Sequence, residues 1–285
     1  MATQEPTVYK FRKANLKASA LLVAAGALVG VCTTAQADQA SIEEGIQQYR
    51  DMLSDGNPAE LAEFKGEDLW KQKQGPKNAS LEQCDLGLGA GVVKGAFAQL
   101  PRYFADTHQV MDLETRLVYC MQTLQGRDTT ALVQHPFSKG AEPQTELESL
   151  AAYVSAQSKG MPVNVPQSRP EERASRARGE KLFFYRSGPY DFACASCHGV
   201  KGQRIRLQEL PELSKPEDAR NSFTAWPAYR VSEGAVRTMQ WRIYDCFRQQ
   251  RFPALKFGSQ ASIDLITYLG VTAKGGIEKT PALKR

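Results

Sequence analysis

The run Cys194-Ala195-Ser196-Cys197-His198 constrains this chain more than any other part of its sequence. Two thiols three positions apart can add across the two vinyl groups of one haem, and the adjoining His198 can then bind the iron as proximal ligand. A CxxC pair can instead bind zinc or act as a thioredoxin-type dithiol, but zinc requires a second ligand pair and a thioredoxin motif lies in a βαβ pattern. The sequence offers neither context here, so we interpret Cys194, Cys197 and His198 as the site of one covalently bound haem c.

The first 37 residues have the composition of a cleaved export signal, with a basic start, an apolar stretch and a small-residue cleavage site. These regions are, in order, residues 10–17, 18–31 and 35–37. The apolar stretch is too short to span a bilayer comfortably, so we expect no membrane span. We expect Cys32 to leave with the signal and the mature chain, residues 38–285, to lie in the bacterial periplasm.

The cysteines that remain after cleavage outnumber those that the haem requires. They are Cys84, Cys120, Cys194, Cys197 and Cys246. In an oxidising compartment the three outside the haem motif are not expected all to stay as idle thiols. One disulfide and one unpaired cysteine is the simplest arrangement.

The chain also contains an internal repeat of about 110 residues. Successive matches occur at offsets of 113, 126 and 115 residues. They pair Gly66 with Gly179, Cys84 with Cys197, Pro101 with Pro227, Tyr103 with Tyr229, Arg116 with Arg242, Cys120 with Cys246 and Tyr153 with Tyr268. An ordered series of this kind indicates a duplicated unit with a longer loop in the second copy.

The two copies differ at the haem motif. Opposite Cys194 the first copy has Leu81, and opposite His198 it has Asp85. The first copy therefore cannot bind haem in the same way.

Cys84 and Cys120 nevertheless remain in the first copy, and the cysteines aligned with them would face each other across a haem in the second. With no haem between them, Cys84 and Cys120 can close a disulfide, which the loop-entropy model values at roughly 3–4 kcal/mol. Two unrelated buried thiols are the alternative.

Periodicity predicts a mainly helical fold. In the second copy, helical spacing of apolar residues covers 176–185, before the haem motif, and again 263–269, with Ser262 as the N-cap. A first and a last helix packed together, with haem attached between them, is typical of class I cytochrome c domains. We predict two tandem domains of this kind, the first degenerate and haem-free. The expected boundaries are a signal peptide at 1–37, the degenerate domain at 38–159, a proline-containing linker at 160–173 and the haem domain at 174–285.

Charge also separates the two halves. Residues 38–165 carry a net charge of −7, and residues 166–285 carry +9. The basic half is expected to attract anions, either small ones or an acidic partner surface. A solubilising face on each domain is the alternative explanation. We do not expect nucleic-acid binding, because an exported haem protein without a basic, aromatic-rich stripe does not fit that class.

Met239 and Cys246 are the candidates for the distal iron ligand. Methionine is the usual ligand in electron carriers and raises the haem potential. Cys246 is favoured, because it aligns with another cysteine and is the odd residue of the cysteine count, whereas Met239 aligns with Leu113. A thiolate would lower the potential, which suits a reaction centre better than an electron shuttle.

Arg242 precedes Cys246 by four residues, which is one turn of a helix. A guanidinium beside a thiol lowers its pKa and can hold a sulfur oxyanion through paired hydrogen bonds. The alternatives are a surface arginine or a partner of a haem propionate, and the survival of Arg116 in the first copy supports them in part. Asp245, directly before Cys246, is a further candidate partner.

Together these features resemble the SoxA family, the larger subunits of the SoxAX cytochromes of thiosulfate oxidation. The most specific part of the resemblance is the haem motif followed by Arg242-x-x-x-Cys246, and the match extends over most of the mature chain. Some family members carry haem in both halves. Because Leu81 and Asp85 replace the first haem motif here, the resemblance implies a single-haem member with a disulfide instead.

The resemblance implies L-cysteine S-thiosulfotransferase activity, in which thiosulfate is joined oxidatively to a cysteine of the carrier SoxYZ. It also implies a heterodimer with SoxX, a small cytochrome c. By position, His198 and Cys246 bind the iron, Cys246 takes part in catalysis as a persulfide, and Arg242 binds the substrate anion. Two other functions stay open: an electron-transfer cytochrome with Met239 on the iron, and a haem-containing scaffold that only orients a catalytic partner.

Overall fold

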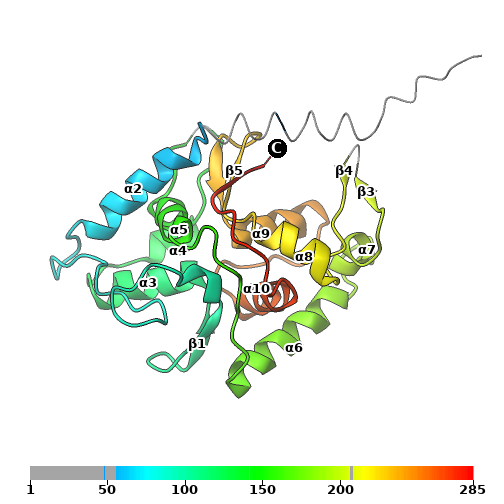
Figure 1. Ribbon diagram of the computed structural model, residues 1–285, viewed down its shortest axis with the longest axis horizontal. Helices are drawn as coiled ribbons and strands as arrows, with labels where there is room; N and C mark the ends of the chain where they lie inside the picture. Colours follow the sequence, from blue (N-terminus) through cyan, green and yellow to red (C-terminus); the bar gives the residue numbers. More distant parts are fainter. Residues whose placement is uncertain (1–47, 49–55, 141, 206–207, 285) are drawn as a thin grey trace, which may run out of the picture. The chain divides into compact units, whose positions relative to one another are not determined.

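The computed structural model describes residues 48, 56–140, 142–205 and 208–284. The predicted signal peptide at 1–37 lies outside these residues. The described part of the chain is mainly helical, with short two- and three-stranded sheets between the helices (Figure 1). None of the helices described is long and apolar enough to cross a membrane.

We call residues 56–159 the N-terminal half. Its elements are α2 (Ala59–Lys71), η1 (Phe97–Gln99), β1 (Arg102–Phe104), β2 (Gln109–Met111), α3 (Leu113–Thr123), α4 (Thr130–Gln134) and α5 (Glu146–Ala156). Strands β1 and β2 form an antiparallel hairpin, and α2 packs along α5.

We call residues 160–284 the C-terminal half. Its elements are α6 (Pro170–Phe184), α7 (Cys194–His198), β3 (Arg204–Ile205), β4 (Gln208–Glu209), α8 (Pro216–Phe223), β5 (Ala228–Arg230), β6 (Ala235–Arg237), α9 (Met239–Gln249), α10 (Gln260–Thr272) and β7 (Ala282–Lys284). Strands β5 and β6 form an antiparallel hairpin, which β7 extends by pairing in parallel with β5.

The two halves use the same helix crossing. A Cβ atom on Gly66 of α2 would overlap the carbonyl oxygen of Ser149 on α5. Likewise, a Cβ atom on Gly179 of α6 would overlap the carbonyl oxygen of Asp264 on α10. Only glycine allows backbones to approach this closely. The hairpins correspond too, because β5 and β6 lie 126 residues after β1 and β2, at the offset found in the sequence.

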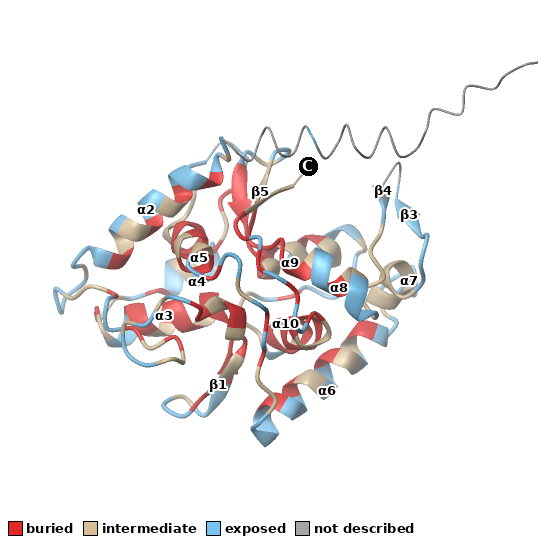
Figure 2. Ribbon diagram, viewed as in Figure 1, coloured by how far each residue is buried: buried red, intermediate tan, exposed pale blue. Residues whose placement is uncertain are grey.

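Each hairpin packs against the other half of the chain. Strands β1 and β2 contact α6, whereas β6 contacts α2 and α5. Val236 of β6 is fully buried among alanines of α2 and α5. Beside it, the buried guanidinium of Arg237 pairs with the buried carboxylate of Glu148 and donates to the hydroxyl of Ser138. Each half thus has its own hydrophobic core, and smaller buried clusters join the two (Figure 2).

Two predicted boundaries were wrong. Helix α6 begins at Pro170, inside the predicted linker 160–173, because proline suits the first helical position and the Glu172 carboxylate accepts from the Arg169 N–H at 3.0 Å. The preceding residues are packed as well, since Val163 is buried and exchanges backbone hydrogen bonds with residues 275 and 276. The N-cap of α10 is Ser259 rather than Ser262.

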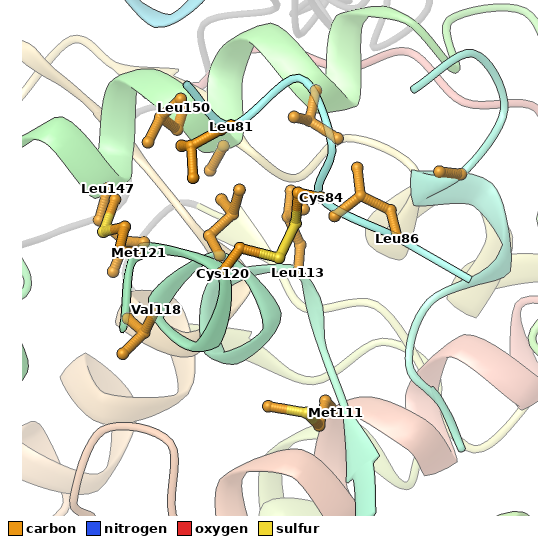
Figure 3. Packing of buried hydrophobic residues seen from close by; sticks show 14 of the residues in the cluster. Leu81, Cys84, Leu86, Met111, Leu113, Val118, Cys120, Met121, Leu147 and Leu150 are labelled. Carbon is orange, nitrogen blue, oxygen red and sulfur yellow. A yellow bond between two sulfur atoms is a disulfide. The ribbon is translucent and has the colours of Figure 1, made fainter. Parts of the chain in front are cut away.

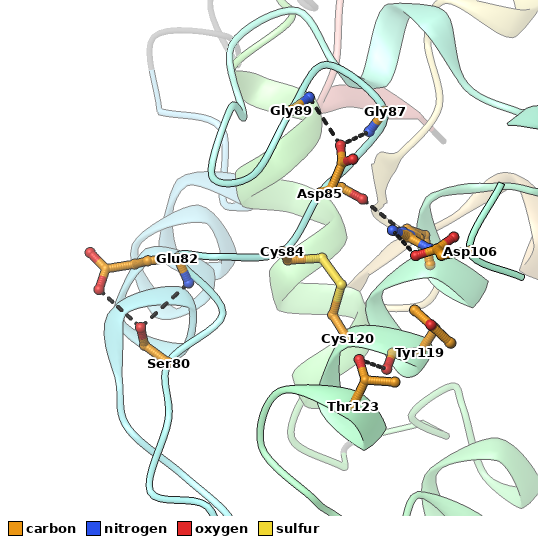
Figure 4. Close-up of a disulfide and its surroundings, with 11 residues drawn as sticks. Ser80, Glu82, Cys84, Asp85, Gly87, Gly89, Asp106, Tyr119, Cys120 and Thr123 are labelled. Atoms are coloured by element: carbon orange, nitrogen blue, oxygen red, sulfur yellow. Dashed lines mark hydrogen bonds and ion pairs between the residues drawn. A yellow bond between two sulfur atoms is a disulfide. The ribbon is translucent and has the colours of Figure 1, made fainter. Parts of the chain in front are cut away.

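The predicted disulfide between Cys84 and Cys120 is present, with Cα atoms 5.7 Å apart. It lies inside the hydrophobic core of the N-terminal half (Figure 3). The neighbouring Asp85 stands where the second copy has His198, and its carboxylate accepts from the N–H groups of Gly87 and Gly89 (Figure 4). Thus a turn and a disulfide occupy the place of the haem motif.

Candidate active site

A cavity of about 460 Å³ lies in the C-terminal half. This volume is within the range of small-molecule and cofactor sites. Most of its wall is apolar, formed by Phe183, Leu213, Phe223, Trp226, Ile243, Phe247, Leu265 and Leu269. The same wall includes five of the residues singled out from the sequence, namely Cys194, His198, Met239, Arg242 and Cys246.

The haem motif forms the short helix α7 by itself. Its start is fixed by the Ser196 hydroxyl, which accepts from the Ala193 N–H at 2.9 Å. At its end, His198 places Nδ1 2.9 Å from the carbonyl oxygen of Pro211. If Nδ1 carries the proton, Nε2 keeps its lone pair for a metal. Burial lowers the pKa of His198, which favours this neutral, ligating form.

Cys246 and Arg242 both come from α9, one turn apart. The helix is capped by Thr238, whose hydroxyl accepts from the Trp241 N–H at 3.3 Å. Burial raises the pKa of the Cys246 thiol, and Arg242 opposes that shift without reversing it. The guanidinium therefore acts in the expected direction, but loss of water around the sulfur outweighs the nearby charge and the net pKa is raised.

The two cysteines of the CxxCH motif, Cys194 and Cys197, lie close enough to Cys246 for their charges to interact. Burial raises the pKa of Cys194 to about 12, and the charge of Cys246 adds to the effect. Cys197 is not among the cavity-lining residues, but its charge also acts on both Cys194 and Cys246. The three sulfurs thus belong to one neighbourhood.

Asp245 holds Arg242 rather than lining the cavity. Its side chain is 8 % exposed and lies 3.3 Å from Arg242, while Arg248 and Gln249 also donate to it, at 2.8 and 2.6 Å. The carboxylate can therefore orient the guanidinium of Arg242 without fully occupying it.

Arg116, the counterpart of Arg242 in the N-terminal half, has a different environment. It is buried, it donates to the Asp85 carbonyl oxygen at 2.7 Å, and it pairs with Asp106 at 2.8 Å. Its guanidinium lies 4.0 Å from the centre of the Phe104 ring. Arg116 is a structural residue, whereas Arg242 faces the cavity.

Sequence reasoning missed Arg230 and Pro211, which also line the cavity. Arg230 had a usable signal, because it occupies the position that Phe104 has in the first copy, so that a charge replaces an aromatic ring. Pro211 acts through its backbone carbonyl, which no side-chain pattern reveals.

The residues present fit a haem. The wall is apolar, a motif thiol lies in it, and the Pro211 carbonyl leaves one histidine nitrogen available for iron. The motif follows α6 and precedes the antiparallel pair β3 and β4, so it does not sit in the βαβ unit of a thioredoxin site. Within the described ranges, no group of three or more His, Cys, Asp or Glu side chains is placed to hold a bare metal ion.

Comparison with known proteins identifies the family of this chain. A family model described as the SoxA/TsdA cytochrome c domain matches residues 65–163. The L-cysteine S-thiosulfotransferase subunit SoxA of Hydrogenophilus thermoluteolus is 47 % identical over 96 % of this chain and 100 % of that protein. A SoxA of Hydrogenobacter thermophilus is 33 % identical, over 91 % of this chain and 96 % of that protein.

Among solved structures, the crystal structure of SoxXA from P. pantotrophus superposes with a TM-score of 0.68 at 23 % identity, covering 84 % of each chain. That similarity establishes a shared fold. With nearly full-length relatives at up to 47 % identity, the chain belongs to the SoxA family.

Proposed function

We propose that this chain is the SoxA subunit of a periplasmic L-cysteine S-thiosulfotransferase, which couples thiosulfate to a cysteine on a SoxYZ-type carrier. One observation carries the proposal: Cys194, His198, Arg242 and Cys246 line a single apolar cavity. A haem-binding motif, a second sulfur and an anion-binding group are thereby combined in one site. The names of the nearly full-length relatives support the same activity.

The proposed organisation is two tandem class I cytochrome c-like domains, the first at 38–159 and the second beginning with α6 at Pro170, joined by residues 160–169 after removal of the signal peptide 1–37. The family match over 65–163, the shared helix crossing and the matching hairpins support a cytochrome c origin for the first domain. The disulfide and the turn at Asp85 support its haem-free state.

We assign one haem c to the second domain. Cys194 and Cys197 would attach it, with His198 as proximal and Cys246 as distal ligand. The geometry of Met239 supports this choice, because Met239 packs against the buried Trp226 and Trp241 and is thus engaged in the core. A bound haem supplies a one-electron redox centre close to these sulfurs.

The chain's own residues would bind and orient the sulfur substrate. Arg242 would hold the sulfonate oxygens of thiosulfate and so direct its outer sulfur towards Cys246, one helical turn away. Cys246 would take part as a persulfide. Joining that outer sulfur to the carrier's cysteine sulfur forms one S–S bond, removes the thiol proton and releases two electrons. Since one haem accepts one electron, we assign the second to the haem of a SoxX-type partner in a heterodimer.

The rival function is an electron-transfer cytochrome with Met239 on the iron, and it has one observation in its favour, because Met239 also lines the cavity. Low-temperature EPR of the oxidised, haem-loaded protein distinguishes the two. A low-spin thiolate-type signal in the wild type, lost in Cys246→Met and kept in Met239→Leu, supports the transferase. A His/Met-type spectrum that Cys246→Met leaves unchanged would favour the electron carrier.

A purely scaffolding role makes a separate prediction. If the chain only orients a catalytic partner, Cys246→Ala should keep turnover as long as the complex with the partner assembles. We expect the complex to assemble and turnover to be lost.

A further inference from the structure

Three cationic side chains from three different elements line the haem cavity. Arg242 comes from α9, Arg230 from β5 and Lys284 from β7. Arg230 and Lys284 are paired in register in the parallel β5–β7 ladder, so their side chains leave the sheet on the same face. The ladder thus places two basic side chains next to each other at the cavity wall.

The residues of the N-terminal half that align with this wall differ from it in charge. There Arg116 stacks on Phe104 and pairs with Asp106. At the offset of 126 residues, Phe104 corresponds to Arg230 and Asp106 corresponds to Ser232. The C-terminal half has therefore lost one carboxylate and gained one guanidinium beside the cavity arginine.

Arg230 lies in the cavity wall, and its guanidinium has N–H groups that are not engaged by the described residues. Its guanidinium lies 5.9 Å from the centre of the Trp241 ring, within cation–π range. Its Nε–H is buried and has no hydrogen-bond partner among the described residues, and one terminal nitrogen makes only a long contact, 3.5 Å, with Ser232. Burial, together with the charge of Arg242, lowers the pKa of Arg230.

Among the described residues, three of the carboxylates near this wall already have other partners, and the fourth is exposed. Asp245 accepts from Arg248 and Gln249 as well as Arg242, and Glu233 pairs with Arg237 at 3.4 Å. Two further acids line the cavity, namely Asp218, which accepts from the Glu212 N–H at 2.8 Å, and the exposed Glu209.

We infer that Arg230 is a second substrate-binding residue, which together with Arg242 forms a site for a divalent sulfur oxyanion, with Lys284 as the neighbouring cation. This inference rests on the proposed function and makes it more specific. Two guanidinium groups on separate elements can each donate to sulfonate oxygens, so the site would select a dianion over a monoanion. The competing assignment pairs Arg230 with a haem propionate.

The test uses the haem-loaded chain in its complex with the SoxX-type partner, supplied with a SoxYZ-type carrier as the thiol substrate and with an acceptor for the two electrons released. Thiosulfate-dependent turnover is measured for wild type, Arg230→Gln, Arg230→Lys and Lys284→Gln. Lys256→Gln, an exposed residue outside the cavity wall, is the control for loss of one positive charge. Sulfate, of charge −2, and nitrate, of charge −1, serve as competing anions that do not react. The haem absorption spectrum and the midpoint potential are recorded for every variant.

For Arg230→Gln we expect the thiosulfate KM to rise about tenfold or more, the typical effect of losing a charged hydrogen bond. The preference for sulfate over nitrate should fall with it, the spectrum and potential should stay unchanged, and Arg230→Lys should recover part of the loss. A shifted potential with an unaltered KM would overturn the inference in favour of the propionate. If Arg230→Gln does not fold, the test uses Arg230→Lys instead. Its thermal unfolding midpoint shows that it is folded, and its thiosulfate KM should then exceed that of wild type.

Failure of the proposed function has a different signature. If the wild-type complex turns over no thiosulfate, yet sulfate perturbs the haem spectrum in an Arg230-dependent manner, the dianion site stands and the transferase assignment falls. If wild type turns over thiosulfate and Arg230→Gln matches Lys256→Gln in every measurement, only the inference about Arg230 fails.

Discussion

The side-chain amide of Gln240 donates a 2.6 Å hydrogen bond to the carboxylate of Asp112, across the boundary between the two halves of the chain. Asp112 also caps α3 by accepting from the Thr115 N–H. The other end of Gln240 accepts from the Gly258 N–H and from the Ser262 hydroxyl. One buried amide thus joins the N-terminal half to the start of α9 and to α10.

Replacing Gln240 with alanine should leave these buried groups without their partners. Burying an unsatisfied polar group costs about 1–3 kcal/mol, so we expect a clear fall in the thermal unfolding midpoint. Gln134→Ala, at an exposed position on α4, is the matched control. Equal midpoints for the two variants would show that the amide does not tie the halves together.

Gly179→Ala should destabilise the C-terminal half. Its new methyl group would overlap the Asp264 carbonyl oxygen, and forced overpacking typically costs about 1–3 kcal/mol. Gly66→Ala should behave alike, because it meets the Ser149 carbonyl oxygen in the same way. Gly56→Ala, with nothing within 4 Å, should be nearly neutral in the same denaturation experiment. A neutral Gly179→Ala would mean that the α6–α10 pair can separate without cost.

Removing the disulfide should affect stability and not the haem site. For a loop closed by cysteines 36 residues apart, the double variant Cys84→Ala/Cys120→Ala should lose about 3–4 kcal/mol of unfolding free energy. Both sulfurs lie in the N-terminal core, away from the cavity-lining residues, so haem content and spectrum should be kept. Loss of haem in this variant would contradict that separation.

Glu278 should make the protein less stable as the pH rises. Its carboxyl group is 2 % exposed and, within the described part of the chain, accepts no hydrogen bond, and burial raises its pKa to about 8 from an ordinary value of 4.5. Between these two values the folded state binds the proton and the unfolded state does not, so stability falls from about pH 4.5 to about pH 8.

Glu278→Gln should therefore be more stable than wild type at pH 8 and similar to it at pH 5, as measured by unfolding midpoints. Glu171→Gln, at an exposed position, should show no such pH-dependent gain. An equal gain at both pH values would indicate that Glu278 is not protonated in the folded state at pH 5.

Arg242→Ala should markedly reduce thiosulfate-dependent activity while haem is retained, because the guanidinium lines the cavity and is not needed for the core. Arg116→Ala is the informative comparison, because its guanidinium is buried and fully engaged. That variant should lose stability and, at temperatures where it stays folded, keep its thiosulfate KM. An unchanged rate for Arg242→Ala would count against its role in binding substrate.

The haem motif, the Cys84–Cys120 pair and the offsets of the repeat were all readable from the sequence, because each depends on residue identity at fixed spacing. The packing of residues 160–163 was not, since they are held by backbone hydrogen bonds to residues 275–278, more than 100 positions away in the sequence. The hydrogen bond between His198 and Pro211 could not be predicted either, because a backbone carbonyl oxygen leaves no residue-type signal in the sequence. Arg230 was visible only as a departure from the repeat, which becomes meaningful once β5 is known to border the cavity.

Because each hairpin packs against the other half of the chain, a substitution in one half can affect the other. Strand β6 is fastened to α2 and α5, and β6 pairs with β5, whose last residue is Arg230 at the cavity wall. A substitution where α2 or α5 meets β6 can therefore shift the rim of the cavity, although neither helix lines it. The N-terminal half thus supports the strand pair that carries Arg230, and loosening β6 against α2 and α5 is expected to move that side chain.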